Sequence, residues 1–225
     1  MKKITFILAL ILVCSHILLA QNPNENKKPR IALILSGGGA KGIAHIPVLQ
    51  MLDSLGIVPD LVVGNSMGSI VGGLYAMGYS GDSIAHIAKT ANWDNLIGGN
   101  VSLNNVSVEE KTEFGRYLIG MGAKDGKIKL TPFLLNDQNL RTFLADLTYP
   151  VYTNTNFDKL SIPFRAIATD IVNGKEVVLD KGDLAFAMRA SMSIPGAFIP
   201  VPYENTLLID GGVLNNFPVD VAKKL

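Results

Sequence analysis

The chain has 225 residues, of which 48% are hydrophobic and 17% charged, and its formal net charge at pH 7 is +1. This length suits one domain with a substantial core. The near-neutral charge gives no electrostatic footprint for nucleic acid, so nucleic-acid binding is not expected. The one cysteine, Cys14, lies near the N-terminus, so the rest of the chain offers neither disulfides nor thiolate metal sites.

The first twenty residues have the pattern of a secretory signal peptide. Lys2 and Lys3 precede an apolar run from Ile4 to Ala20, and a basic start, an apolar centre and a small final residue are typical of such peptides. An uncleaved N-terminal anchor is the alternative, because the run could just span a bilayer. We therefore expect export to the periplasm, the outer membrane or the medium, with a flexible leader over residues 21–29 before a domain over residues 30–225.

Strands and helices are expected to alternate from residue 31 onward. Up to residue 77, the patterns predict a strand over 31–35, mainly loop over 37–44, a helix that begins near Ile46 or Pro47 and stops at Gly56, a strand over 61–64 and a helix over 67–77. The unalternated apolar runs are typical of parallel strands that are buried on both faces. This order predicts a right-handed parallel arrangement with ligands at the carboxyl ends of the strands.

The second half of the chain continues the same alternation. The expected elements are helices over 82–90 and 183–190, the latter capped by Asp183, strands over 164–168, 177–179 and 207–209, and loops or a hairpin over the site from residues 98–130. A helical pattern begins at Pro218. Because a further strand should follow that helix, we expect a C-terminal part beyond residue 225.

The pentapeptide Gly64-Asn65-Ser66-Met67-Gly68 is a candidate nucleophile elbow. In a G-x-S-x-G turn between a strand and a helix, the flanking glycines relieve crowding around a strained serine. The N-terminus of the following helix directs free N–H groups at developing negative charge. Ser66 is therefore the candidate nucleophile, and it needs a base.

The chain offers few bases for Ser66 beyond the N-terminal segment. The sequence around His86 predicts a position on the surface of a helix. For His45, a position at a helix N-terminus or a packing role is favoured. A carboxylate is the better candidate, because an aspartate with a raised pKa can accept a serine proton. Asp210 follows an apolar strand and should project beside Ser66, although an Asp-Gly turn is the simpler alternative. Asp170 is a second carboxylate, for which a turn or a structural hydrogen bond is favoured.

The segment Ser36-Gly37-Gly38-Gly39-Ala40-Lys41-Gly42 is a candidate oxyanion hole. Consecutive glycines after a strand allow backbone N–H groups to point together into a cleft. The segment also matches G-x-G-x-x-G, but the acidic residue that a dinucleotide site needs at the end of the second strand is absent there. No Gly-Lys-Ser/Thr follows, so a phosphate P-loop is excluded.

Four blocks in order resemble the patatin-like phospholipases over residues 30–225. They are Gly37 to Gly42, Gly64 to Gly68, Ala190-Ser191-Met192-Ser193-Ile194-Pro195-Gly196-Ala197-Phe198, and Asp210-Gly211-Gly212. The resemblance implies a three-layer α/β/α sandwich with a mainly parallel central sheet. It further implies a serine acyl hydrolase that uses a Ser-Asp dyad, requires no metal or cofactor and acts on lipid acyl esters.

Residue by residue, the resemblance implies a role for each matching position. Ser66 becomes the nucleophile, Asp210 the base, and Gly37, Gly38 and Gly39 the oxyanion hole. Lys41 stands where many members have arginine, so it offers the point charge of an ammonium group in place of a forked guanidinium group. Exported bacterial members often carry further C-terminal domains, including an outer-membrane barrel, and such an envelope domain is compatible with this chain.

The leading hypothesis is hydrolysis of phospholipid or lysophospholipid acyl esters, with the Met67 N–H as an additional oxyanion donor. A set of apolar residues could line an acyl cleft or make transient contact with a membrane surface: Phe114, Tyr117, Leu118, Ile119, Met121, Phe133, Leu134 and Leu135. Ordinary core packing is the alternative for each of them. The competing functions are a neutral-lipid or short-chain esterase with the same dyad, a dinucleotide-binding protein and an idle interaction module of an envelope protein.

Overall fold

The computed structural model describes residues 29–97, 120–124, 127–131 and 137–224. The chain divides into two units, residues 1–30 and 31–225, and the fold described here is that of the second unit. Within the described residues, none of the helices combines the length and the hydropathy needed to cross a membrane.

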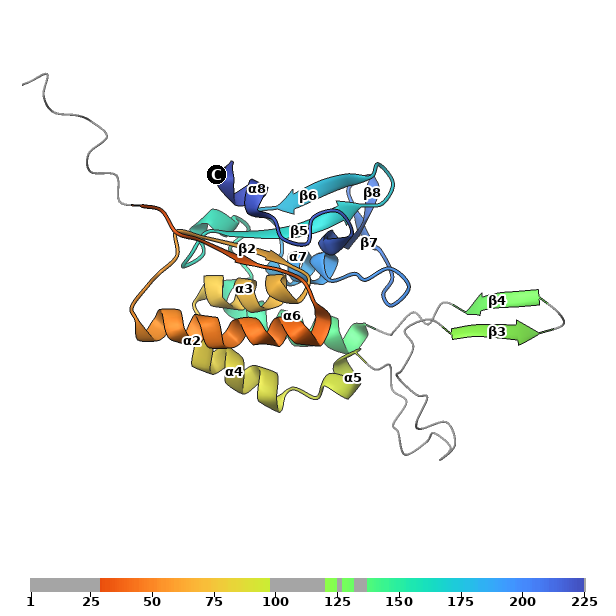
Figure 1. The fold of residues 1–225 in the computed structure, drawn as a ribbon, viewed down its shortest axis with the longest axis horizontal. Helices are drawn as coiled ribbons and strands as arrows, with labels where there is room; N and C mark the ends of the chain where they lie inside the picture. The colour runs from red at the N-terminus through yellow and green to blue at the C-terminus, as the bar shows by residue number, and fades with distance from the viewer. Residues whose placement is uncertain (1–28, 98–119, 125–126, 132–136, 225) are drawn as a thin grey trace, which may run out of the picture. The chain divides into compact units, whose positions relative to one another are not determined.

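A mixed sheet forms the centre of this unit (Figure 1). Its six strands are β1 (Ala32–Leu35), β2 (Leu61–Asn65), β5 (Phe164–Asp170), β6 (Lys175–Leu179), β7 (Val201–Tyr203) and β8 (Thr206–Asp210). The strands β1, β2 and β5 are parallel to one another. Both β6 and β8 run antiparallel to β5, and β7 runs antiparallel to β8.

The strand β5 has two neighbours along one of its edges. Its residues 166–170 pair with β6, its residues 164–167 pair with β2, and its residues 168–170 pair with β8. Because a strand has only two edges and β6 occupies one of them, β2 and β8 must share the other. The carboxyl ends of β2 and β8 therefore meet beside Ile167 and Ala168, which are opposite Asn65 and Asp210.

Helices cover both faces of the sheet. They are α2 (Ile46–Ser54), α3 (Met67–Met77), α4 (Gly81–Thr90), α5 (Trp93–Ile97), α6 (Gln138–Thr148), α7 (Leu184–Ser191) and α8 (Val219–Lys223), with 3-10 turns η1 (Gly39–His45), η3 (Tyr149–Val151), η4 (Phe157–Lys159) and η5 (Gly211–Val213). The helix α8 contacts β1 and β2, and α3 and α7 contact the sheet through β2 and β5. Figure 1 shows α8 on one side of the sheet and α2, α3 and α4 on the other.

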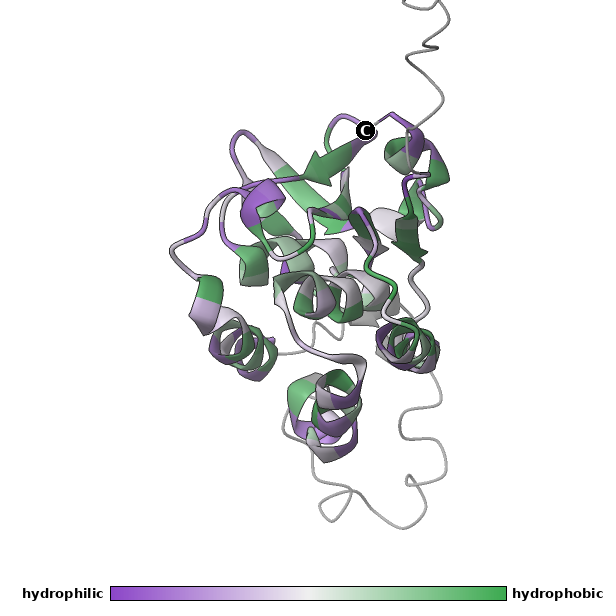
Figure 2. Cartoon of the chain, turned by 90° about the vertical axis from the view of Figure 1, so that its left-hand side faces the viewer, coloured by the Kyte–Doolittle hydropathy of each residue, from purple (hydrophilic) through white to green (hydrophobic). Residues whose placement is uncertain are grey.

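Each face of the sheet has its own apolar cluster. Val62 and Phe164 belong to the larger cluster, which includes residues of α3, α6 and α7, whereas Val63 and Ile167 pack with Val221 of α8. Successive side chains of a strand point to opposite faces, so a strand that is buried on both faces is apolar over most of its length. Figure 2 shows hydrophobic residues along these strands and both hydrophilic and hydrophobic residues on the outer helices. The expected three-layer α/β/α sandwich is confirmed, with β1, β2 and β5 as its parallel part.

Most of the predicted elements are present with similar bounds. The strands predicted over 31–35, 61–64, 164–168, 177–179 and 207–209 and the helices predicted over 67–77, 82–90 and 183–190 are confirmed. The Asp183 cap is also confirmed, since its Oδ1 accepts a hydrogen bond of 2.6 Å from the Phe186 N–H. The helices α5 and α6 and the strand β7 were not predicted.

The prediction of mainly loop over residues 37–44 was wrong. A 3-10 helix, η1, begins at Gly39, whose φ of +55° turns the chain after the glycine run. The Lys41 N–H donates to the Gly38 carbonyl over 3.1 Å and closes the first turn. From residues 98–130, the described part is an antiparallel hairpin of β3 (Gly120–Lys124) and β4 (Lys127–Thr131). Of the residues proposed for an acyl cleft, all except Met121 in β3 lie outside the described ranges.

One carboxylate links α2, α3 and α4. Asp53 Oδ1 accepts a hydrogen bond of 2.7 Å from the Tyr75 hydroxyl, and its Oδ2 accepts one of 2.6 Å from the Gly81 N–H. Burial, together with the neighbouring Asp53, raises the pKa of Tyr75 to about 12, so the hydroxyl keeps its proton at neutral pH. Asp53 therefore joins the outer helices to the helix that follows Ser66.

We expect Asp53→Ala to lower the free energy of unfolding by about 1–3 kcal/mol, because it leaves two donors without their acceptor. Urea denaturation followed by circular dichroism measures the change. Asp146→Ala is the control, since Asp146 is exposed on α6. Equal stability of the two variants would contradict the linking role of Asp53.

Candidate active site

Ser66 lies alone between a strand and a helix. The strand β2 ends at Asn65 and α3 begins at Met67, and Ser66 has φ 53° and ψ −124°. A positive φ is a strained conformation for a residue with a side chain, and such strain gathers at functional sites. An added Cβ on Gly64 would lie 2.4 Å from the Gly68 carbonyl oxygen, so the elbow needs a glycine at this position. The conformation matches a nucleophile elbow.

Asp210 is the last residue of β8, and its carboxyl group is largely buried. The residue is 7% exposed, and Ser66 is 6% exposed. The Gly212 N–H donates to Asp210 Oδ1 over 2.7 Å. Burial raises the pKa of Asp210 above its ordinary value of 3.8, while the neighbouring Ser66 hydroxyl and the Gly212 N–H act in the opposite direction. A carboxylate with a raised pKa is a better proton acceptor than an ordinary surface aspartate.

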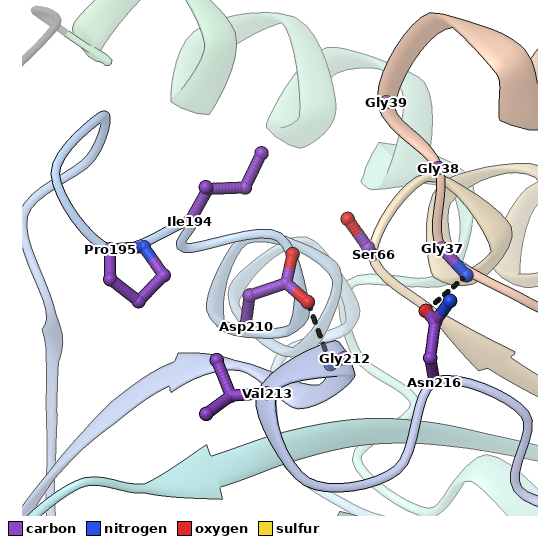
Figure 3. A pocket seen from close by; sticks show the side chains of 10 residues that line it. All are labelled: Gly37, Gly38, Gly39, Ser66, Ile194, Pro195, Asp210, Gly212, Val213 and Asn216. Atoms are coloured by element: carbon purple, nitrogen blue, oxygen red, sulfur yellow. Dashed lines mark hydrogen bonds between the residues drawn. The ribbon is translucent and has the colours of Figure 1, made fainter. Parts of the chain in front are cut away.

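Ser66 and Asp210 line the same pocket, which has a volume of about 330 Å³. The lining residues are Gly37, Gly38, Gly39, Ser66, Ile194, Pro195, Asp210, Gly212, Val213 and Asn216. Figure 3 shows the glycine run on one side of the pocket and the side chains of Ile194, Pro195 and Val213 on the other, with the Asp210 carboxyl group and Ser66 between them. One wall is therefore backbone and the opposite wall is apolar.

The three glycines of the pocket differ in their hydrogen bonding. The Gly37 N–H donates to Asn216 Oδ1 over 3.0 Å. Within the described ranges, the N–H groups of Gly38 and Gly39 have no hydrogen-bond partner. These two donors are therefore available to an oxygen in the pocket, whereas the Gly37 N–H is already occupied.

Two other predicted site residues do not line the pocket. Lys41 is exposed on η1. The Met67 side chain is buried and lines a separate apolar cavity with Ile43 and Ile70. The Met67 backbone N–H remains at the N-terminus of α3, directly after Ser66.

His45, His86 and Asp170 lie apart from this pocket. His45 Nε2 is 2.9 Å from the Ser36 carbonyl oxygen at the start of α2, and His86 is exposed on α4. Asp170 accepts hydrogen bonds from the Asn173 side chain and backbone, from the Thr206 hydroxyl and from the Val172 N–H. These bonds lower the pKa of Asp170 to about 2, and the bonds from the Asn173 side chain and the Thr206 hydroxyl have the largest effect. Asp170 therefore has the turn role that the sequence favoured.

Two serines at the end of α7 and directly after it, Ser191 and Ser193, hold the backbone of Ser66 and Asp210. Ser191 Oγ accepts a hydrogen bond of 2.9 Å from the Ser66 N–H and donates one of 2.5 Å to the Ile167 carbonyl. The Ser193 carbonyl accepts a bond of 2.9 Å from the Asp210 N–H. No role was predicted for these serines, although the run of small residues in their block indicates close packing.

Arg189 fixes the segment that carries these serines. This side chain is 3% exposed and forms an ion pair with Asp137, with a distance of 2.7 Å from Nε to Oδ2. Its Nη1 donates to Ser193 Oγ over 2.5 Å, and its guanidinium lies 4.8 Å from the centre of the Phe198 ring. A buried arginine of this kind needs its charged partner, because an unpaired charge would be strongly disfavoured there. The ion pair therefore anchors the segment between α7 and β7 to the start of α6.

Comparison with known proteins agrees with the fold and with the sequence blocks. A family model described as Patatin-like phospholipase matches residues 33–223. An uncharacterized NTE family protein of Mycobacterium bovis is 34% identical over 194 residues, which cover 86% of this chain and 46% of that protein. Lysophospholipase NTE1 of Meyerozyma guilliermondii is 31% identical over 210 residues, which cover 86% of this chain and 12% of that protein. The chain belongs to the patatin-like phospholipase family.

A solved structure shares the same fold. VipD from Legionella pneumophila superimposes with a TM-score of 0.54 over 85% of this chain and 47% of that protein, at 16% sequence identity. The chain thus spans less than half the length of these relatives.

We expect Ser191→Ala to lower the free energy of unfolding by about 1–3 kcal/mol, because it leaves the buried Ser66 N–H and the Ile167 carbonyl without their shared partner. Ser161→Ala is the matched control, since the exposed Ser161 hydroxyl makes a long bond of 3.4 Å to the Met77 carbonyl. Thermal and urea denaturation compare the two variants. A Ser191→Ala variant as stable as Ser161→Ala would show that this hydroxyl does not hold the elbow.

Proposed function

We propose that this domain is a serine acyl hydrolase that cleaves the fatty-acyl esters of phospholipids or lysophospholipids through a Ser66–Asp210 dyad. The observation that carries the proposal is that a serine in a strained elbow shares one pocket with a buried carboxyl group of raised pKa. A serine hydroxyl is a weak nucleophile at neutral pH unless a neighbouring base removes its proton.

In the first half of the proposed reaction, Ser66 Oγ attacks the ester carbonyl carbon while Asp210 accepts the hydroxyl proton. The carbonyl π electrons move to its oxygen and give a tetrahedral oxyanion. When this intermediate collapses, the bond to the alcohol oxygen breaks and Asp210 returns the proton to that oxygen. The products are an acyl-enzyme on Ser66 and the free lysolipid or glycerophospho alcohol.

In the second half, water takes the place of the alcohol. The water oxygen attacks the acyl-enzyme carbonyl while Asp210 accepts a proton from the water. When the second intermediate collapses, the bond to Ser66 Oγ breaks, Asp210 returns the proton to Ser66 Oγ, and the fatty acid is released. One carboxyl group thus serves as base and acid in turn, which a pKa between that of an ordinary aspartate and neutrality favours.

The proposed oxyanion donors are the backbone N–H groups of Gly38, Gly39 and Met67. The two glycine N–H groups lie in the lining of the pocket without a partner among the described residues. Fixed N–H donors that need not reorganise are an effective way to stabilise developing negative charge, and the loss of one typically costs a hundredfold or more in rate.

The apolar wall of the pocket supports an acyl substrate. Ile194, Pro195 and Val213 offer no charged group to the bound molecule, and an apolar wall favours a hydrocarbon chain over a polar one. The name of the Meyerozyma guilliermondii relative, Lysophospholipase NTE1, supports the lipid class. A neutral-lipid or short-chain ester would use the same dyad, so a panel of acyl esters with different head groups distinguishes these substrates.

We also propose that the protein is exported and acts at a lipid surface. The support is the sequence of residues 1–20, with Lys2 and Lys3 before the apolar run. A substrate that resides in a bilayer would require transient contact between the pocket mouth and that surface.

A serine-directed fluorophosphonate should label the wild-type protein and fail to label Ser66→Ala, with turnover of an acyl ester lowered by more than about a thousandfold. Asp210→Asn should label much more slowly yet remain folded, because the amide oxygen can still accept the Gly212 N–H and the substitution removes a buried charge. In-gel fluorescence and melting temperature give the two readouts. Labelling of Ser66→Ala at the wild-type rate would refute the assignment of the nucleophile.

The pH dependence of kcat/KM tests the base. Asp210 must be ionised to accept a proton, so activity should fall as the pH drops through its pKa in the folded protein. Because burial raises that pKa, the acid limb should lie above the ordinary aspartate value of 3.8. A profile that stays flat down to pH 4, over a range where the protein is shown to be folded, would contradict Asp210 as the base.

A further inference from the structure

The Asn216 side chain joins three segments of the pocket. Its Oδ1 accepts a hydrogen bond of 3.0 Å from the Gly37 N–H and a second one of 2.8 Å from Asn65 Nδ2. Gly37 begins the glycine run, Asn65 directly precedes Ser66, and Asn216 itself lies in the turn after Asp210 and η5. Figure 3 shows Asn216 beside the glycine run, with its bond to Gly37 drawn as a dashed line.

The chemistry of the donors fixes the orientation of both amides. A backbone N–H can only donate, so the Asn216 atom that faces Gly37 must be its oxygen. That oxygen in turn requires the Asn65 amide to present its NH₂ group. Asn65 is fully buried, and its Oδ1 is a buried side-chain oxygen without a partner among the described residues. The bond to Asn216 therefore matters for Asn65 as well.

The glycines around the two asparagines pack closely against them. An added Cβ on Gly37 would lie 2.7 Å from Asn216 Oδ1, and one on Gly212 would lie 3.0 Å from it. An added Cβ on Gly211 would lie 2.4 Å from Asn65 Oδ1. Distances below about 3 Å are far shorter than carbon–oxygen contacts allow. Side chains at Gly37, Gly211 or Gly212 would therefore collide with this asparagine pair.

We infer that Asn216 is a positioning residue for the oxyanion hole, a role that rests on the proposed acyl-hydrolase function. By accepting the Gly37 N–H, it holds the first peptide of the glycine run, so that the next two N–H groups remain in the pocket. A run of three glycines has large conformational freedom, and an unheld run would have to be ordered in every transition state. An anchor that orders it in advance lowers the barrier, since preorganised donors need no rearrangement.

This role predicts a specific kinetic effect. Asn216 does not donate to the oxyanion itself in this proposal, and the apolar wall that contacts the acyl chain is formed by other residues. Its removal should therefore weaken the binding of the tetrahedral intermediate while leaving the binding of substrate nearly unchanged. In steady-state terms, kcat should fall and KM should stay within about twofold.

The neighbouring asparagine provides a matched control. Asn215 Nδ2 donates to Glu176 Oε2 over 2.6 Å and to Asp220 Oδ1 over 2.8 Å. These bonds connect the same turn to β6 and α8 and do not involve the glycine run. A variant at position 215 thus disturbs the turn without releasing Gly37.

The experiment compares Asn216→Ala and Asn215→Ala in the full chain on a water-soluble acyl ester. We expect kcat to fall by about 10- to 100-fold in Asn216→Ala and by less than about threefold in Asn215→Ala, since an indirect role should cost less than the loss of an oxyanion donor. Affinity for an acyl trifluoromethyl ketone, which forms a tetrahedral adduct on the serine, should fall in parallel with kcat. Equal kinetics in the two variants, or a change confined to KM, would overturn the inference.

Amide hydrogen exchange in the wild-type protein tests the anchor without any variant. The Gly37 amide should exchange at least about tenfold more slowly than the Gly38 and Gly39 amides, which have no partner among the described residues. Equal exchange of the three amides would overturn the inference even if Asn216→Ala does not fold. If no acyl ester is turned over and Ser66 is not labelled, the proposed function fails instead. A protein that is active while Asn216→Ala behaves as Asn215→Ala retains the proposed function and loses only the role of Asn216.

Discussion

The strands β2 and β8 both pair with the same edge of β5, and the site depends on this arrangement. The strand β8 runs antiparallel to β2, so its carboxyl end would lie at the opposite end of the sheet if the two strands overlapped fully. They do not overlap, because β2 pairs with the first four residues of β5 and β8 with the last three. The two carboxyl ends therefore face each other, and Asp210 arrives beside the elbow that follows Asn65.

Three energetically unfavourable features lie around that meeting point. Ser66 has a positive φ, the Asp210 carboxyl group is buried, and Asn65 Oδ1 lacks a partner in the described part of the chain. Each of these features is energetically costly by itself. The surrounding structure holds these groups in place through buried contacts that take no part in the proposed chemistry. Ser191 accepts a hydrogen bond from the Ser66 N–H, and Arg189 donates one to the Ser193 hydroxyl. A rigid scaffold can hold strained groups ready for a reaction because its large apolar clusters offset their cost.

Local patterns predicted the parts of the fold that depend on local physics. Continuous apolar runs predicted the buried strands, helical spacing predicted α3 with the bounds that the structure has, and the carboxylate of Asp183 predicted a helix N-terminus. The patterns did not predict α6 or β7, and they predicted loop where η1 begins. The last error has a clear cause, since three glycines contribute no apolar periodicity and the turn that starts η1 arises from the φ of Gly39.

By itself, the sequence determined the chemical groups of the candidate site: a serine in G-x-S-x-G, a glycine run after the first strand and an Asp-Gly-Gly turn. These are local signals, because each depends on the backbone freedom or reactivity of a few adjacent residues. Only the tertiary structure showed that Asp210, the carboxylate that the sequence favoured, lines the same pocket as the serine. Asp170 and Asp210 both stand at strand ends, but the hydrogen bonds around Asp170 lower its pKa to about 2, whereas burial raises the pKa of Asp210. Burial and hydrogen bonding depend on neighbours that are distant in sequence, so the sequence could favour Asp210 over Asp170 but could not show the surroundings that set the pKa of either carboxyl group.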